Sequence, residues 1–200
     1  MPAAPHYKAD LTAGSLKPAE SRVIADLLLR QVSEEEWKRQ IVTQNVLQVR
    51  HPATATRLTR LIRGRLETMG PELWRLVRDG TGVVPLQALL AAAVKHSLLL
   101  ADFLELVVAE QYRLFQTRLS PTLFTSFLEG CRERDPQLAE WSPATCRRLR
   151  SSLFQILAQA GYLENTRTLR LQPVQIAPQV VHYLSAHHET AVLRCLQISP

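Results

Sequence analysis

Three arginines at helical spacing have the clearest chemical potential in this chain of 200 residues. Arg57, Arg60 and Arg63 follow one another every three residues, which places them about one turn apart on one face of a helix expected over residues 52–69. Leucine and isoleucine side chains fall on the other face and are expected to pack inward. Like charges stacked in this way repel one another unless an anion neutralises them. The pattern therefore predicts a phosphate-binding face, and the plainer alternative is a solvated helix surface.

A second group of hydrogen-bond donors lies in residues 141–171. Ser142 suits an N-cap, Pro143 the first helical position and Gly161 the C-terminal end, so a helix is expected between them. Leucines and Ile156 fall on one arc of this helix and are expected to be buried. The opposite arc offers charged and amide donors. Its candidate nucleic-acid-binding residues are Arg147, Arg148, Ser151 and Gln155.

A short alternating segment follows this second helix. Turn residues at Asn165 and Thr166 separate Tyr162–Glu164 from Thr168–Leu171, where apolar and polar side chains alternate. This pattern predicts a small β-hairpin, which with the preceding helix would form a winged helix-turn-helix. In such a module the helix enters the DNA major groove and the wing contacts the backbone. Arg167 and Arg170 would then be wing contacts.

Positive charge is concentrated in two parts of the chain. The formal net charge is +6 at pH 7 and the sequence pI is about 9.6. Residues 37–65 contain seven basic and no acidic residues, which adds Lys38, Arg39 and Arg50 to the candidate binding residues. Residues 141–200 carry a further excess, so the rest of the chain is acidic overall. Such polarised charge is typical of a protein that presents a basic surface to a polyanion.

The motifs of common enzyme classes are missing from the sequence. The seven glycines form neither a GxxxxGK[ST] loop nor a GxGxxG loop, and no GxSxG or HExxH motif is present. His182, His187, His188 and Cys195 lie close in sequence but match no standard metal-ligand spacing. Asp102 and Glu105 are one turn apart in an apolar segment, where pairing with basic residues is more plausible than acid/base catalysis. The sequence thus predicts a binding protein, with no enzymatic activity, cofactor or metal.

The elements that would position these arginines are predominantly helical. We expect a mainly α-helical fold with a small β-hairpin wing, in which a winged helix-turn-helix-like C-terminal part packs on a helical N-terminal part. Three regions are predicted: an N-terminal helical subdomain with the basic helix (1–80), central apolar helices (81–140) and the winged-helix-like subdomain (141–200). The chain breaks at Gly80–Gly82 and at Arg134–Pro136 favour these boundaries.

The apolar segment Leu86–Val108 raises the question of a membrane span. Lys95, His96, Asp102 and Glu105 interrupt it, so buried core helices fit the segment better. The N-terminus has no apolar run of the kind that signal peptides carry. Three distant cysteines indicate neither a disulfide framework nor a zinc site. A cytoplasmic protein without membrane insertion is therefore expected.

Several short stretches, read in order, resemble one known family. The first group lies in the N-terminal half: Tyr7–Leu16, Glu20–Ala25, and Trp37 with Asn45–Leu47. The second group lies in the C-terminal half: Trp141–Thr145, Leu149–Arg150, Ala160–Leu163 and Val192–Leu196. Together they resemble the BrxA family of bacteriophage-exclusion (BREX) systems, and the similarity covers nearly the whole chain.

This resemblance implies a small, helical, cytoplasmic component of bacterial phage defence, with winged-helix-like character and no catalytic motif. It implies sequence-independent binding of double-stranded DNA, and other BREX subunits as partners. Two alternatives remain open. In the first, the protein is an adaptor whose basic faces dock acidic surfaces of other defence-complex subunits. A distant likeness of the family to the NusB fold would instead favour RNA, although the Arg57–Arg63 face has no aromatic side chain for stacking on exposed bases.

Overall fold

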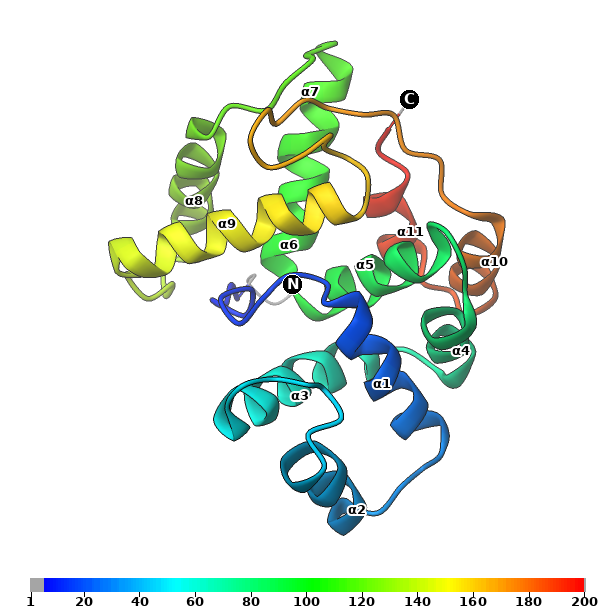
Figure 1. Cartoon of the computed structure of the whole chain (residues 1–200). Coiled ribbons are helices and arrows are strands. Elements are labelled where there is room, and N and C mark those ends of the chain that lie inside the picture. The colour runs from blue at the N-terminus through cyan, green and yellow to red at the C-terminus, as the bar shows by residue number, and fades with distance from the viewer. Residues whose placement is uncertain (1–5, 200) are drawn as a thin grey trace.

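The computed structural model describes residues 6–199, which fold almost entirely into helices and the loops that join them (Figure 1). Two helices continue without a break through a π-helical stretch: α2 into η1, and α6 through η2 into α7. The elements in chain order are α1 (Pro18–Leu29), α2 (Glu34–Lys38), η1 (Arg39–Thr43), α3 (Pro52–Leu66), α4 (Pro71–Asp79), α5 (Val84–His96), α6 (Leu98–Asp102), η2 (Phe103–Val108), α7 (Ala109–Arg113), α8 (Thr122–Arg134), α9 (Pro143–Gln159), α10 (Pro178–Ala186) and α11 (Thr190–Leu196).

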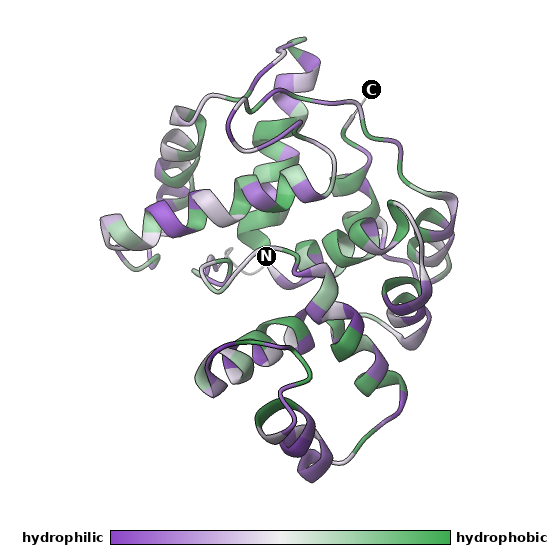
Figure 2. Cartoon of the chain, viewed as in Figure 1, coloured by the Kyte–Doolittle hydropathy of each residue, from purple (hydrophilic) through white to green (hydrophobic). Residues whose placement is uncertain are grey.

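The core is built around two apolar helices, α5 and the continuous helix Leu98–Arg113. They meet at Ser97 with a bend of 110°, and both are strongly hydrophobic through the middle of the molecule (Figure 2). Ser97 is fully buried, and its hydroxyl accepts the backbone N–H of Leu100. Within residues 6–199 no single helix is long and apolar enough to cross a membrane, and these two reach that length and composition only together, as a bent pair.

A cluster of phenylalanines holds α8 and α9 on the Leu98–Arg113 helix. Phe103 is fully buried, and its ring lies 5.1 Å from that of Phe127 in α8 and 6.4 Å from that of Phe154 in α9. Edge-on and tilted ring pairs at these separations add to the stabilisation that burial alone provides. The orientation of α9, and hence of its basic face, therefore depends on this aromatic contact.

The predicted β-hairpin wing is wrong, and with it the winged helix-turn-helix. Among the described residues there is no β-strand, and residues 162–171 make only isolated bridges, Leu163 with Leu171 and Arg118 with Arg170. Two local features explain the difference. The Asn165 side chain accepts two backbone N–H groups and curls the chain, and Leu169 has a left-handed φ of 50°, which interrupts an extended strand.

The helix predicted before this segment is confirmed. It spans Pro143–Gln159, and the Ser142 hydroxyl accepts the backbone N–H of Thr145 at 3.2 Å, as an N-cap does. The fold is therefore mainly helical, as expected, but its C-terminal part contains helices and a curled loop. The hydrophobic core is one continuous cluster of side chains that extends from Tyr7 to Leu196.

The segment before α1 is tied down between α3 and α9 (Figure 1). Arg65 of α3 is only 4% exposed and donates hydrogen bonds to the carbonyls of Ser15 and Gly14, at 2.7 and 3.2 Å. On the other side, the Gln159 amide oxygen of α9 accepts the backbone N–H of Leu16 at 3.0 Å. Burial lowers the pKa of Arg65 to about 10, so the guanidinium stays charged at neutral pH. This segment spaces the two basic helices.

Replacing Arg65 with methionine is expected to destabilise the protein. The substitution leaves two buried carbonyls without their charged donor, a loss of roughly 1.5–3 kcal/mol. For a chain of this size, that corresponds to a fall in melting temperature of about 4–10 °C, measurable by thermal unfolding. Arg65→Lys keeps one charged donor, so its melting temperature should lie between those of the unchanged protein and Arg65→Met. An unchanged melting temperature for Arg65→Met would show that the N-terminal segment is held by other contacts.

Candidate nucleic-acid interface

The two basic surfaces predicted from the sequence meet at one cleft. Its volume is about 590 Å³, and its walls come from α3, from the first half of α9 and from the N-terminal segment. The lining residues are Thr12, Arg57, Ala144, Arg147, Arg148, Ser151 and Ser152. Arg57 is separated from Arg147 by most of the central part of the chain, so only the fold brings these guanidinium groups together.

The charge of this cleft is uncompensated. The side chains of Arg57, Arg147 and Arg148 are exposed, and within residues 6–199 none of them makes an ion pair or a side-chain hydrogen bond. No carboxylate lines the cleft, and Ser151 and Ser152 contribute hydroxyl donors. Guanidinium groups and hydroxyls in a cleft whose lining contains no acid form a site suited to phosphate oxygens.

The sequence places these side chains by burying the opposite face of each helix. In α3 the buried residues are Ala55, Leu58, Leu61, Ile62, Arg65 and Leu66. In α9 they are Leu149, Leu153, Phe154, Ile156 and Leu157. A helix whose apolar stripe is fixed in a core must present the remaining residues to solvent. The arginines therefore face outward because the leucines face inward.

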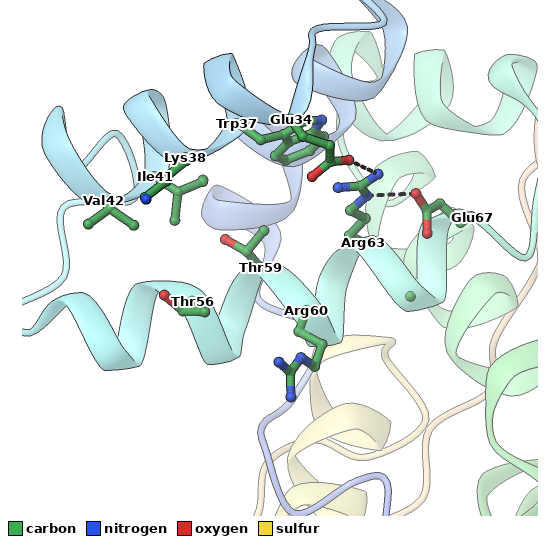
Figure 3. A pocket seen from close by; sticks show the side chains of 11 residues that line it. Glu34, Trp37, Lys38, Ile41, Val42, Thr56, Thr59, Arg60, Arg63 and Glu67 are labelled. Atoms are coloured by element: carbon green, nitrogen blue, oxygen red, sulfur yellow. Dashed lines mark hydrogen bonds and ion pairs between the residues drawn. The ribbon is translucent and has the colours of Figure 1, made fainter.

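Arg63 has a different environment from Arg57, although both are on α3. Its guanidinium bonds Glu34 at 2.8 Å and Glu67 at 2.7 Å, and lies 4.7 Å from the centre of the Trp37 ring (Figure 3). The hydrogen bond to Glu34 is the main cause of its raised pKa. Arg63 is thus neutralised by the protein itself, and the structure separates it from the cleft arginines.

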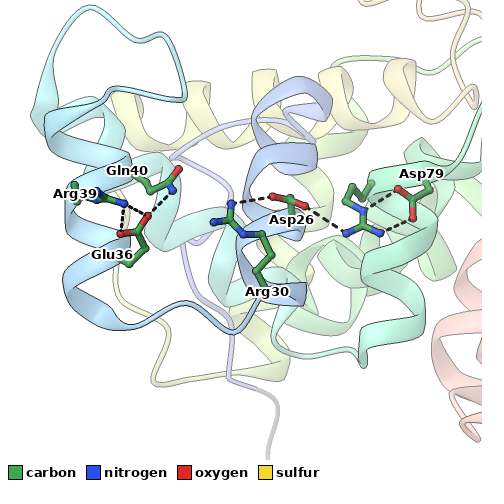
Figure 4. Close-up of polar contacts among 7 residues, drawn as sticks. Asp26, Arg30, Glu36, Arg39, Gln40 and Asp79 are labelled. Atoms are coloured by element: carbon green, nitrogen blue, oxygen red, sulfur yellow. Dashed lines mark hydrogen bonds and ion pairs between the residues drawn. The ribbon is translucent and has the colours of Figure 1, made fainter.

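The other candidates from the N-terminal region are also outside the cleft. Arg60 and Lys38 line the groove that contains Trp37, about 490 Å³ in volume (Figure 3). Arg60 makes no ion pair among the described residues. Arg39 is paired with Glu36 at 2.6 Å (Figure 4), and Arg50 is exposed in the loop before α3.

The remaining C-terminal candidates are dispersed. Gln155 is exposed on α9, one turn beyond Ser151, and does not line the cleft. Arg167 and Arg170 belong to the curled loop after α9 and are exposed there. Three lining residues, Thr12, Ala144 and Ser152, were not predicted. Thr12 had no recognisable signal, because its proximity to the arginines arises only when the N-terminal segment packs between the helices.

The fold and the cleft define a mainly helical protein with one strongly basic, acid-free cleft. The BrxA family model matches residues 5–188. A BREX protein BrxA from Paramagnetospirillum magneticum (strain ATCC 700264 / AMB-1) is 49% identical over 197 residues, which cover 98% of this chain and 99% of that protein. The chain therefore belongs to the BrxA family of BREX phage-defence systems.

Two further comparisons agree with this assignment. A BREX protein BrxA from Escherichia coli O9:H4 (strain HS) is 36% identical over 170 residues, 85% of this chain and 80% of that protein. A crystal structure of an uncharacterized protein from Magnetospirillum magneticum superimposes with a TM-score of 0.90 at 47% identity, over 98% of this chain and all of that chain. The helical architecture is therefore shared with an experimentally determined fold.

Truncation of the paired and the unpaired arginine of α3 should affect stability differently. Arg63→Ala removes two ion pairs and a cation–π contact and is expected to lower the free energy of unfolding by about 1 kcal/mol. Arg57→Ala removes a charge with no partner and should change it by less than about 0.5 kcal/mol. Thermal unfolding at low and at high salt measures both. Equal losses of stability in the two variants would contradict the difference between a paired and an unpaired arginine.

Proposed function

We propose that this BrxA-family protein binds double-stranded DNA at the α3–α9 cleft as a component of a BREX phage-defence system. The observation that carries the proposal is the convergence of Arg57, Arg147 and Arg148, three exposed guanidinium groups with no acidic partner among the described residues. Folding gains nothing from placing like charges together, whereas a polyanion neutralises them and releases its condensed counterions. Function at DNA would place the protein in the cytoplasm.

Binding at this cleft should be indifferent to base sequence. Arginine and serine side chains contact phosphate oxygens, which position a duplex but carry no sequence information. The adenine-reading type of side chain, an amide such as Gln155, lies outside the cleft. No carboxylate, histidine or cysteine lines it either, which supports a binding role without catalysis.

A duplex fits the cleft better than a single strand. Proteins that bind single-stranded DNA or RNA stack the exposed bases on aromatic side chains, typically beside a basic groove. The cleft is lined by no aromatic residue. Within the proposal, the polar and charged lining therefore supports contact with the outer phosphates of paired strands.

Charge reversal in the cleft should weaken DNA binding. Arg57→Glu and Arg147→Glu each replace an attraction to phosphate with a repulsion and are expected to reduce affinity for duplex DNA at least tenfold. The slope of log affinity against log salt should fall by about 1 for each arginine–phosphate pair that a substitution removes. Fluorescence anisotropy with labelled duplexes of two unrelated sequences gives both quantities.

Arg75→Glu is the matched control, because Arg75 is exposed on α4, away from the cleft, and the substitution changes the net charge equally. It should leave affinity within about twofold of the unchanged protein. Circular dichroism must show the same helix content in all variants. The proposal fails if cleft and control variants weaken binding equally, since binding would then follow net charge and not this cleft.

A further inference from the structure

An exposed aromatic side chain follows the continuous core helix Leu98–Arg113. Just after α7, Leu114 is 55% exposed and Phe115 is 91% exposed. The other phenylalanines of the chain, Phe103, Phe124, Phe127 and Phe154, are at most 6% exposed. Isolated apolar residues on a surface need no explanation, but a fully solvated phenyl ring beside a leucine at a projecting helix end differs from that background.

The backbone holds this ring outward in a conformation that is unfavourable for phenylalanine. Phe115 has a left-handed φ of 53°, the position after a helix that glycine usually occupies. Its N–H donates to the carbonyl of Tyr112 at 3.0 Å, and the N–H of Gln116 donates to Gln111 at 2.9 Å. These two hydrogen bonds fix the backbone at the helix end that carries the exposed ring.

Positive charge flanks the ring. Arg118 lies directly opposite Arg170 in an antiparallel bridge, so two like charges share one side of the pairing, an arrangement that destabilises it. The Arg118 guanidinium donates to the carbonyl of Thr168 at 3.0 Å, which fixes its position. Arg167 is exposed in the same loop, and none of these three arginines forms an ion pair in residues 6–199. The charges of these three arginines are therefore not neutralised by ion pairs within the described residues.

We propose that the α7 tip, defined as Leu114, Phe115, Arg118, Arg167 and Arg170, docks an acidic surface of another protein that holds an apolar pocket for the Phe115 ring. Aromatic and arginine side chains together form the energetic centre of many protein interfaces. The charge complementarity identifies the partner as acidic. This inference does not depend on DNA binding at the cleft.

The exposed phenyl ring favours a protein over a duplex at this tip. A duplex would have to unstack a base step to receive the ring. An apolar pocket in a protein receives the ring without such a change.

The test uses the full-length protein and the purified products of the other BREX genes of the same host, one at a time, by biolayer interferometry. At least one of these proteins should bind, and Phe115→Ala should weaken that binding at least tenfold. Arg118→Glu should weaken it at least threefold and reduce its dependence on salt. Val83→Ala, at a residue that is 56% exposed elsewhere on the surface, and Arg75→Glu are the controls and should bind as the unchanged protein does.

Each other outcome would overturn the proposal. If no BREX protein binds, or if Phe115→Ala binds as well as the controls, the tip is not a docking surface for these subunits. If Phe115→Ala instead lowers duplex affinity in the anisotropy assay, the ring belongs to a nucleic-acid interface. If it converts a dimer to a monomer in light scattering, the occupant is a second copy of this chain. Because Phe115 is exposed, the variant should keep the melting temperature and remain informative.

Discussion

Burial of α5 and of the helix Leu98–Arg113 is the constraint on which the rest of the structure depends. The bend of 110° at Ser97 gives the core two arms: α3 and α4 pack on the first, α8 on the second, and α11 contacts both. The buried Ser97 hydroxyl is fully hydrogen-bonded at this bend, because it accepts the N–H of Leu100 and donates to the Asp10 carboxylate at 2.7 Å. The angle between the arms fixes where α3 lies relative to α9, and therefore whether a basic cleft exists at all.

Ion pairing separates structural arginines from those free to bind. Arg63, Arg78 and Arg194 are neutralised by acids of the protein itself. Asp26 pairs with Arg30 (Figure 4) and also with Arg78. The cleft has no such acid. Because a large continuous core supplies the stability, the fold tolerates a few tenths of a kcal/mol of repulsion for each pair of like charges on its surface. That excess of positive charge is available to an external anion.

Helix positions and buried faces could be predicted from the sequence, because local capping and apolar periodicity specify both. The absence of a winged helix could not be predicted from the sequence, because a turn followed by alternating apolar and polar residues is compatible with either a β-hairpin or a curled loop. The left-handed φ of Leu169 decides for the loop. The ion pairs of the arginines could not be predicted from the sequence either. Arg57 and Arg63 lie on one face of the predicted helix, yet only Arg63 forms ion pairs, one of them with Glu34 of a different helix. Tertiary contacts of this kind leave no periodic signal.

In Figure 1 the end of α7 lies at the top of the view, above α9, whereas α3 lies below α9. The cleft between α3 and α9 and the tip beyond α7 are separate surfaces, formed by different residues. Arg167 and Arg170, predicted from the sequence as DNA contacts, belong to the proposed tip. Under the two proposals, a chain that binds DNA without regard to sequence at the cleft and a protein at the tip would raise the local concentration of that protein along any duplex. Weak affinity at each surface would then be enough to hold the partner protein on DNA, because the second binding event becomes intramolecular.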